Sequence, residues 1–243
     1  MKVSIDLLKS VFEKKKYIWY SDRPNLIGIR TELQVPDIFN DLFIMVWKQE
    51  AMPNGLNAAQ KQKWLNDNLF TGSDGKPLVV DGDFGGKSKF AEQQYLNVLG
   101  KERMETYVIT TDPGTYWLKT PANKLGSALL KRNQWVDKWA LGFHKNKQHP
   151  ALVQVGELEV HRDNDKDIVA EEATTLHKGL FGINIHRSNA TGRTPKIGQW
   201  SAGCQVFQVK TDLDRVLAIC GLYRTKTGNR FTYTLLGEKD LIS

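Results

Sequence analysis

The sequence predicts an α+β protein, mainly β, in which a β-sandwich or mixed sheet carries a small helical insertion. Short apolar runs bounded by Gly, Pro, Asn and Asp occur before residue 50 and again after residue 105. Between them lies a block rich in strong helix formers. The early strands are too few to form a domain alone, so we expect them to pair with later strands. The predicted organisation is a β-rich domain of residues 1–49 and 101–243, interrupted by a helical insertion of residues 50–100.

Local patterns place the elements. Apolar spacing predicts a first helix over 3–15 with Ser4 or Asp6 as its cap, and a late helix over 212–220 that buries Cys220. Two further helices are expected in the insertion, the second capped by Ser88. The runs on either side of Asp112-Pro113-Gly114 predict a hairpin. Other strands are expected at 18–20, 26–30, 41–47, 134–136, 139–143, 151–155, 158–162, 180–186, 206–209 and 231–236.

Composition narrows the class of partner. The chain has 243 residues, seven tryptophans and a formal net charge of +7, which indicates a folded protein attracted to a polyanion: nucleic acid, anionic lipid or an acidic bacterial wall. No helix-turn-helix or zinc-finger signature is present, so no nucleic-acid partner is expected. The two cysteines form neither a disulfide framework nor the usual metal spacing, so neither a metal nor a cofactor is expected. We expect a monomer.

The most informative stretch runs from Gly182 to Gln205. His186 ends an apolar run, and Cys204 closes a small-residue turn that begins at Ser201, after a loop rich in turn residues. A thiol beside an imidazole is a nucleophile with its base. Gly203 allows a tight turn, whose N–H groups at Gly203 and Cys204 are the expected oxyanion donors. The alternative is an inert cysteine that acts as a small hydrophobic residue.

This stretch resembles the active-site motif of the L,D-transpeptidase catalytic domain, in which a strand-end histidine is followed, roughly sixteen to eighteen residues later, by Ser/Thr-x-Gly-Cys. The resemblance covers about 180–206. It implies that Cys204 attacks an amide carbonyl of a peptidoglycan stem peptide, with His186 as base, and that an amine or water resolves the thioester. Ala202 stands where the family usually has a second histidine, and Val206 where it often has Arg or Asn. Transpeptidase, carboxypeptidase and endopeptidase outcomes all remain open.

We expect supporting roles for other residues of this stretch. Asn184 shares a strand face with His186 and is a candidate to orient the imidazole, although an ordinary sheet-edge amide is favoured slightly. Ser201 either holds the turn or binds substrate. The candidates for substrate binding are Arg187, Arg193, Lys196 and Trp200, the three cations being equally well explained as solvated loop charges. The histidines at 144, 149, 161 and 177 are interpreted as surface or structural residues.

The insertion carries a second motif. The loop over 80–88 resembles that of a peptidoglycan-binding helical module, with Asp81, Phe84 and Tyr95 among the matching positions. Gly86 and Ser88 replace the usual proline and threonine. The resemblance implies wall binding; the alternative is a purely structural helical insert.

The acidic run Asp163–Asp167 alternates like the start of a calcium loop. Ile168 and Thr174 occupy the positions where an EF-hand requires Gly and Glu, so a polar turn is predicted and calcium remains the minor alternative.

These inferences predict a peptidoglycan-modifying cysteine enzyme, a transferase or a hydrolase, with stem peptides as partner. The alternatives are a non-catalytic wall-binding or phage structural protein, and a cysteine hydrolase of another amide. No run of eighteen apolar residues occurs, so no membrane span is expected. Charged residues interrupt the N-terminal apolar run, so no signal peptide is expected. We therefore expect synthesis in the cytoplasm and delivery to the wall by lysis, as for an endolysin, or by a secretion machine.

Overall fold

A closed eight-stranded barrel forms the centre of the computed structural model, which describes residues 3–33, 35–145, 149–172 and 175–242. Its strand order is β1-β11-β5-β6-β9-β10-β3-β2, and only the β1–β11 and β9–β10 pairs are parallel. The strands are β1 (Asn25–Arg30), β2 (Asp41–Lys48), β3 (Glu102–Thr110), β5 (Asn133–His144), β6 (His149–Gln154), β9 (Ile185–Arg187), β10 (Gln205–Phe207) and β11 (Phe231–Gly237). The expected mainly β α+β class is confirmed. The sheet is mixed, and it closes on itself instead of forming two facing layers.

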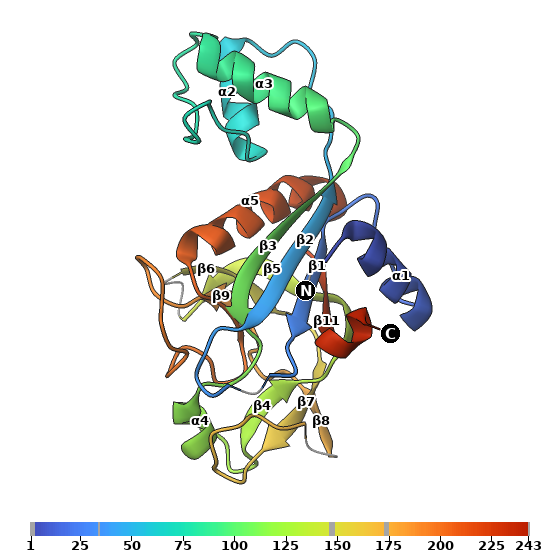
Figure 1. Cartoon of the computed structure of the whole chain (residues 1–243), viewed down its shortest axis with the longest axis vertical. Helices are drawn as coiled ribbons and strands as arrows, with labels where there is room; N and C mark the ends of the chain where they lie inside the picture. The colour runs from blue at the N-terminus through green and yellow to red at the C-terminus, as the bar shows by residue number, and fades with distance from the viewer. Residues whose placement is uncertain (1–2, 34, 146–148, 173–174, 243) are drawn as a thin grey trace.

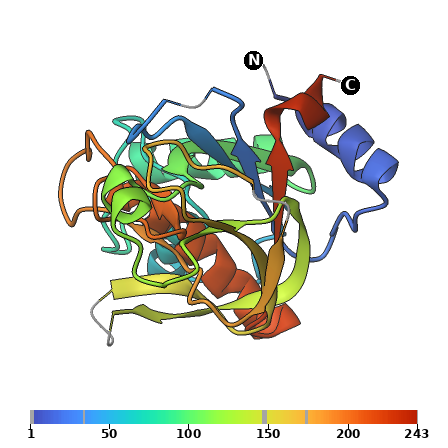
Figure 2. The same ribbon diagram turned by 90° about the horizontal axis from the view of Figure 1, so that it is seen from below.

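Strands β1 and β11 are buried on both faces because alternate residues meet different partners. Leu26 and Phe43 face the barrel interior, whereas Ile27 and Ile44 pack against helix α1 (Ile5–Lys15). Ser4 caps α1 by accepting a hydrogen bond from the Leu7 N–H, which confirms one of the two expected caps. The short 3₁₀ helix η1 (Glu238–Leu241) contacts α1, and both chain ends lie near this pair (Figure 2).

The segment 18–20 is irregular, so the strand expected there is wrong. Trp19 instead packs edge-on against Phe12 of α1, with ring centroids 5.1 Å apart, and this contact draws the segment away from the sheet.

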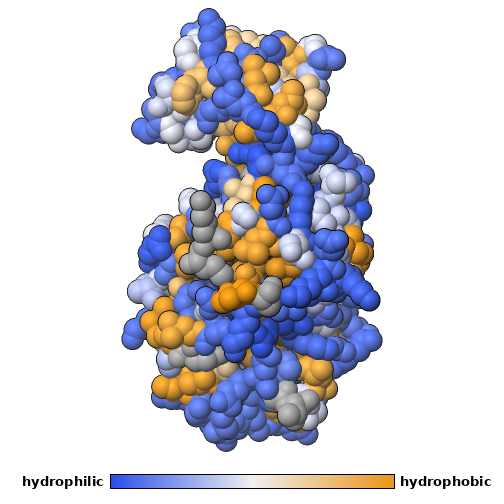
Figure 3. Space-filling model, turned by 45° about the vertical axis from the view of Figure 1, so that its right-hand side comes forward, coloured by the Kyte–Doolittle hydropathy of each residue, from blue (hydrophilic) through white to orange (hydrophobic). Residues whose placement is uncertain are grey.

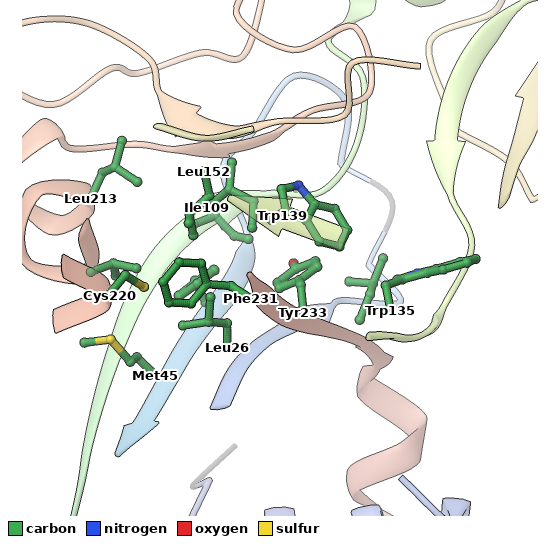
Figure 4. Packing of buried hydrophobic residues seen from close by; sticks show 14 of the residues in the cluster. Leu26, Met45, Ile109, Trp135, Trp139, Leu152, Leu213, Cys220, Phe231 and Tyr233 are labelled. Atoms are coloured by element: carbon green, nitrogen blue, oxygen red, sulfur yellow. The ribbon is translucent and has the colours of Figure 1, made fainter. Parts of the chain in front are cut away.

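Helix α5 (Lys210–Thr227) lies across the barrel and supplies part of its core (Figure 1). Cys220 points from α5 into this core, in the neighbourhood of Met45 and Phe231 (Figure 4), and is fully buried. The interpretation of Cys220 as a core residue is therefore confirmed. Both cysteines are free thiols.

A small antiparallel sheet lies at the end of the barrel away from the helical insertion (Figures 1 and 2). It has the order β4-β7-β8, formed by β4 (Ser127–Leu130), β7 (Leu158–Asp163) and β8 (Leu176–Gly179). Helix α4 (Thr115–Lys119) lies beside it. The hairpin expected around 112–114 is wrong: β3 already pairs with β2 and β10, so neither of its edges is free for another strand.

The insertion folds into a lobe of two helices, α2 (Ala58–Asp67) and α3 (Gly86–Val98), with a small core of its own that includes Leu65 and Ala91. Lys48 of β2 pairs with Glu102 of β3, so the chain leaves and re-enters the barrel at one point. Figure 3 shows the resulting narrow waist.

Arg103 spans this waist. Its guanidinium lies 4.7 Å from the Trp47 ring centroid and 4.6 Å from that of Phe70, and it donates hydrogen bonds to Gln49 Oε1 and to the Asn68 carbonyl. Stacking on one ring from the barrel and one from the lobe ties the two parts together.

Candidate active site

Cys204 lines a pocket of about 370 Å³ between the barrel and the small sheet. The other lining residues come from the segment before β4 and its first residues, from β7, from the segment before β9 and from the turn of Cys204: Ala122, Asn123, Gly126, Ser127, Ala128, Arg162, Leu180, Phe181, Gly182, Ile183 and Ala202. Cys204 directly precedes β10, whose Val206 pairs with His186 of β9. The parallel register places Cys204 opposite Asn184, two residues before the histidine.

The turn that presents Cys204 depends on glycine. Gly203 has φ +123°, and a Cβ atom at this position would lie 2.1 Å from the Ala128 carbonyl oxygen. Ser201 is fully buried: its Oγ donates to the Cys204 carbonyl at 2.9 Å and accepts from the Gly203 N–H at 3.2 Å. Ser201 therefore holds the turn and does not face substrate.

The same contact corrects the expected oxyanion hole. Because Ser201 Oγ already accepts from Gly203, that N–H is not available to an oxyanion. Within the described part of the chain the Cys204 N–H donates to no protein acceptor, so it is the N–H of the turn that is free to serve as an oxyanion donor.

The core of the barrel supports this turn through a buried chain of contacts. The Tyr233 hydroxyl donates to Gln205 Oε1 at 2.9 Å, next to the nucleophile. A Cβ atom at Gly28 would lie 1.9 Å from that hydroxyl, so glycine in β1 makes room for the tyrosine. Strands distant in sequence thus fix the residue that follows Cys204.

His186 lies buried behind the pocket, 2 % exposed. Its Nδ1 lies 2.7 Å from the Arg187 carbonyl oxygen, which can only accept, so Nδ1 carries the proton and Nε2 the lone pair. Burial, together with the nearby His144, lowers the pKa of His186 to about 3. The imidazole is therefore neutral at physiological pH, with a free nitrogen that can accept a proton.

The thiol is held apart from this imidazole. Cys204 Sγ donates to the Gly182 carbonyl and accepts from the Asn184 N–H, both at 3.4 Å, and among the described residues no hydrogen bond joins it to His186. Removal of water by the surrounding protein raises the pKa of the Cys204 thiol to about 11. The resting pair is a neutral thiol and a neutral imidazole, not the thiolate that the sequence led us to expect.

A second histidine, missed from the sequence, completes this region. His144, at the end of β5, stacks on His186 with ring centroids 4.0 Å apart and an interplanar angle of 8°. Asn184 Nδ2 donates to His144 Nδ1 at 2.9 Å, and Asn184 Oδ1 accepts from the Gln154 N–H. Asn184 therefore orients His144 and reaches His186 only through it. Nothing in the local sequence around His144 signals this contact across forty residues.

Arg162 is the charged residue of the pocket, and sequence reasoning also missed it. It pairs with Ala128 across the small sheet, and its guanidinium lies 5.1 Å from the Phe181 ring centroid. Nη1 donates to the Gly126 carbonyl at 3.0 Å, whereas Nε is buried with no partner. Burial lowers the pKa of Arg162.

The residues predicted to bind substrate lie elsewhere. Arg187 donates to the Ser188 carbonyl, and Arg193 donates to Gln208 Oε1 at 2.6 Å. Lys196 is exposed, and Trp200 is 37 % exposed with the Lys145 ammonium 6.0 Å from its ring. None of the four lines the pocket of Cys204: Arg187 belongs to β9, and the loop of the other three is bound to Val209 at Arg193 and to the Asp37 carbonyl at Ile197.

In the lobe, the motif residues stabilise the fold. Asp81 Oδ1 accepts from Gln62 Nε2 and from the Asp83 N–H, both at 2.9 Å. Tyr95 is buried and its hydroxyl accepts from the Met52 N–H, and Phe84 packs against the same core. Ser88 does not cap α3, which begins at Gly86; its hydroxyl accepts from Gln62 instead.

One group of carboxylates could approach a cation in the described part of the chain: Asp165, Asp167 and Glu171, whose ligand oxygens lie within 4.8 Å of one another. All three are exposed, and the loop is held by Asx turns in which Asp165 and Asp167 accept from N–H groups two residues ahead. This geometry agrees with the polar turn predicted from the sequence.

None of the helices among the described residues is long and apolar enough to cross a membrane. Comparisons with protein-family models, with curated proteins and with solved structures gave no match.

Proposed function

We propose that this protein is an L,D-transpeptidase-like cysteine enzyme that cleaves or transfers amide bonds of peptidoglycan stem peptides. One observation carries the proposal: Cys204 lies on a glycine-dependent turn in a pocket, directly before a strand that pairs in parallel with the strand of His186. An inert core cysteine, such as Cys220, lines no such pocket and is fully buried.

The first step follows from the protonation states. The Cys204 thiol leaves the Gly182 carbonyl and turns toward the imidazole. Its proton passes to His186 Nε2 as sulfur bonds to the amide carbon, and the carbonyl electron pair moves to oxygen, where the Cys204 N–H stabilises it. Collapse of this intermediate expels the amine, which takes the proton from His186, and leaves a thioester.

In the second step an acceptor attacks the thioester and releases the thiol, with His186 again moving the proton. An amine from a second stem peptide gives a crosslink, and water gives a shortened stem. Ala202 lines the pocket where the resembling family usually has histidine, and this leaves room for either acceptor.

The lobe supports the same substrate class. Its loop resembles a peptidoglycan-binding module and borders a second pocket of about 400 Å³. Both signs of charge line that pocket, including Asp74, Asp81, Lys76 and Lys87. We propose that the lobe holds the wall polymer while the barrel acts on the peptides.

A second candidate is a non-catalytic wall-binding or phage structural protein. The observation in its favour is the resting thiol, whose pKa is raised to about 11 and which is not hydrogen-bonded to His186 in the described structure.

The test is incubation of purified muropeptides with the protein and its Cys204→Ala and His186→Ala variants, with products identified by mass. We expect crosslinked or shortened stems from the wild type and a loss of at least about a thousandfold in Cys204→Ala. Cys220→Ser is the matched control, because that thiol is buried in the core and should leave products unchanged. Binding of muropeptides without any product from the wild type would establish the second candidate.

A further inference from the structure

An arginine without an acid partner stands in the pocket of the nucleophile. Most buried or half-buried arginines among the described residues meet carboxylates: buried Arg30 meets Asp112 and Glu172, and half-buried Arg132 meets Glu32. Within the residues that the structure describes, Arg162 has no carboxylate within 4.0 Å. A guanidinium withdrawn from water without a counter-charge is costly, so its place calls for a compensating anion.

The free donors of Arg162 are identifiable. The Nη1 atom is engaged by the Gly126 carbonyl, and among the described residues neither Nε nor Nη2 donates to a protein acceptor. Nε is enclosed by protein atoms, so the donor that a ligand can reach is Nη2, whose two N–H groups can bind a carboxylate.

The guanidinium is held in place by packing. Phe181 lies 5.1 Å from the guanidinium carbon, and Gly126, at φ +102°, sits so close to β7 that a Cβ atom would lie 2.0 Å from the Asp163 carbonyl. The side chain is therefore ordered before any ligand arrives.

The fold brings this arginine beside the nucleophile. Arg162 of β7 pairs with Ala128 of β4, and the Ala128 carbonyl packs against Gly203, the residue before Cys204. Both Arg162 and Cys204 line the same pocket. A group bound by the guanidinium therefore lies in the same pocket as the thiol.

We propose that Arg162 binds a free carboxylate of the acyl donor, so that the enzyme selects amide bonds next to a carboxylate-bearing residue. The inference rests on the proposed function, whose substrate it specifies: a stem peptide with an unamidated carboxylate at or beside the scissile bond. A stem amidated at that carboxylate lacks the anion and is a poor substrate.

The experiment compares the rates at which two alkylating agents of similar size react with the full chain at pH 8.5. Iodoacetate carries a negative charge and iodoacetamide is neutral. Modification of Cys204 is followed by peptide mass. Arg162→Gln should lower the iodoacetate-to-iodoacetamide rate ratio by about threefold to tenfold, since a neighbouring charge acts on only one of the reagents. Arg162→Lys, which keeps the charge, should retain most of the ratio. Arg224→Gln, an exposed arginine of α5, is the matched control and should leave it unchanged.

A second measurement needs no variant. N-acetyl-D-alanine should protect wild-type Cys204 from iodoacetamide, and N-acetyl-D-alaninamide should not. Equal protection by both, or an unchanged ratio in a folded Arg162→Gln, overturns the inference.

Neither measurement requires turnover. If both measurements succeed but no muropeptide product forms, the proposed function is refuted and the carboxylate site stands. If muropeptide products form but Arg162→Gln leaves the alkylation rate ratio unchanged, the carboxylate site is refuted and the proposed function stands.

Discussion

The pocket of Cys204 and the loop of the helical lobe differ in what their polar groups do. In the lobe, Gln62 donates to Asp81, to Ser88 and to the Asp83 carbonyl, and it accepts from two N–H groups, so the motif closes on itself. At the pocket of Cys204, Nε of Arg162 is buried without a described partner and the Cys204 N–H donates to no described protein acceptor. A fully hydrogen-bonded network stabilises the fold, whereas unpaired donors in a pocket are available to bind a ligand.

The largest effect that would sharpen this contrast is expected from Gly203→Ala. A methyl group 2.1 Å from the Ala128 carbonyl, on a backbone with φ +123°, must displace β4 or break the turn. We expect a loss of about 3–5 kcal/mol in the free energy of unfolding and loss of product formation. Thermal unfolding and the muropeptide assay measure both.

Gly221→Ala is the matched control. Gly221 lies inside α5 with no atom within 4 Å of an added Cβ, so this change should stabilise by up to about 1 kcal/mol. A Gly203→Ala protein with wild-type stability would contradict the close approach of β4.

Gln62→Ala should act on the lobe alone. It removes a buried side chain that satisfies several polar groups, which should cost the lobe about 2–3 kcal/mol. Amide hydrogen exchange should accelerate in α2 and α3, while the barrel strands and the alkylation of Cys204 stay as in the wild type. Exposed Gln93→Ala serves as control. Faster exchange spread equally over the barrel would show that the two regions are not separable in this way.

The smallest expected effect is a loss of folding stability at acidic pH. The folded pKa of His186, about 3, lies below that of an unfolded histidine, about 6.5, so the unfolded chain binds more protons between these values. Stability should therefore fall as the pH drops below about 6.5, by up to about 1.4 kcal/mol per pH unit. Urea unfolding from pH 7 to 5 measures the slope.

His186→Phe should lose about half of the total slope while keeping an aromatic ring against His144, because the pKa of His144, lowered to about 4, also lies below this pH range and contributes equally. An identical slope in this variant would mean that His186 is already protonated in the folded protein.

The sequence alone determined the elements with strong local signals. Alternation and apolar spacing predicted β1, β2, β11 and α1, because each pattern is read within a few consecutive residues. Residue chemistry singled out Cys204 and His186, and the structure pairs their strands. The small residues of the Ser201–Cys204 turn were enough to predict a tight bend.

Tertiary structure decided what surrounds the thiol. In the closed barrel, β2 and β10 occupy both edges of β3, so the hairpin that the turn residues 112–114 favour cannot form. Barrel closure also brought His144 onto His186 and set Arg162 beside Cys204, through contacts that cross about forty residues of chain. Such neighbours leave no local pattern, and the pKa of each group depends on burial that exists only once the strands have closed.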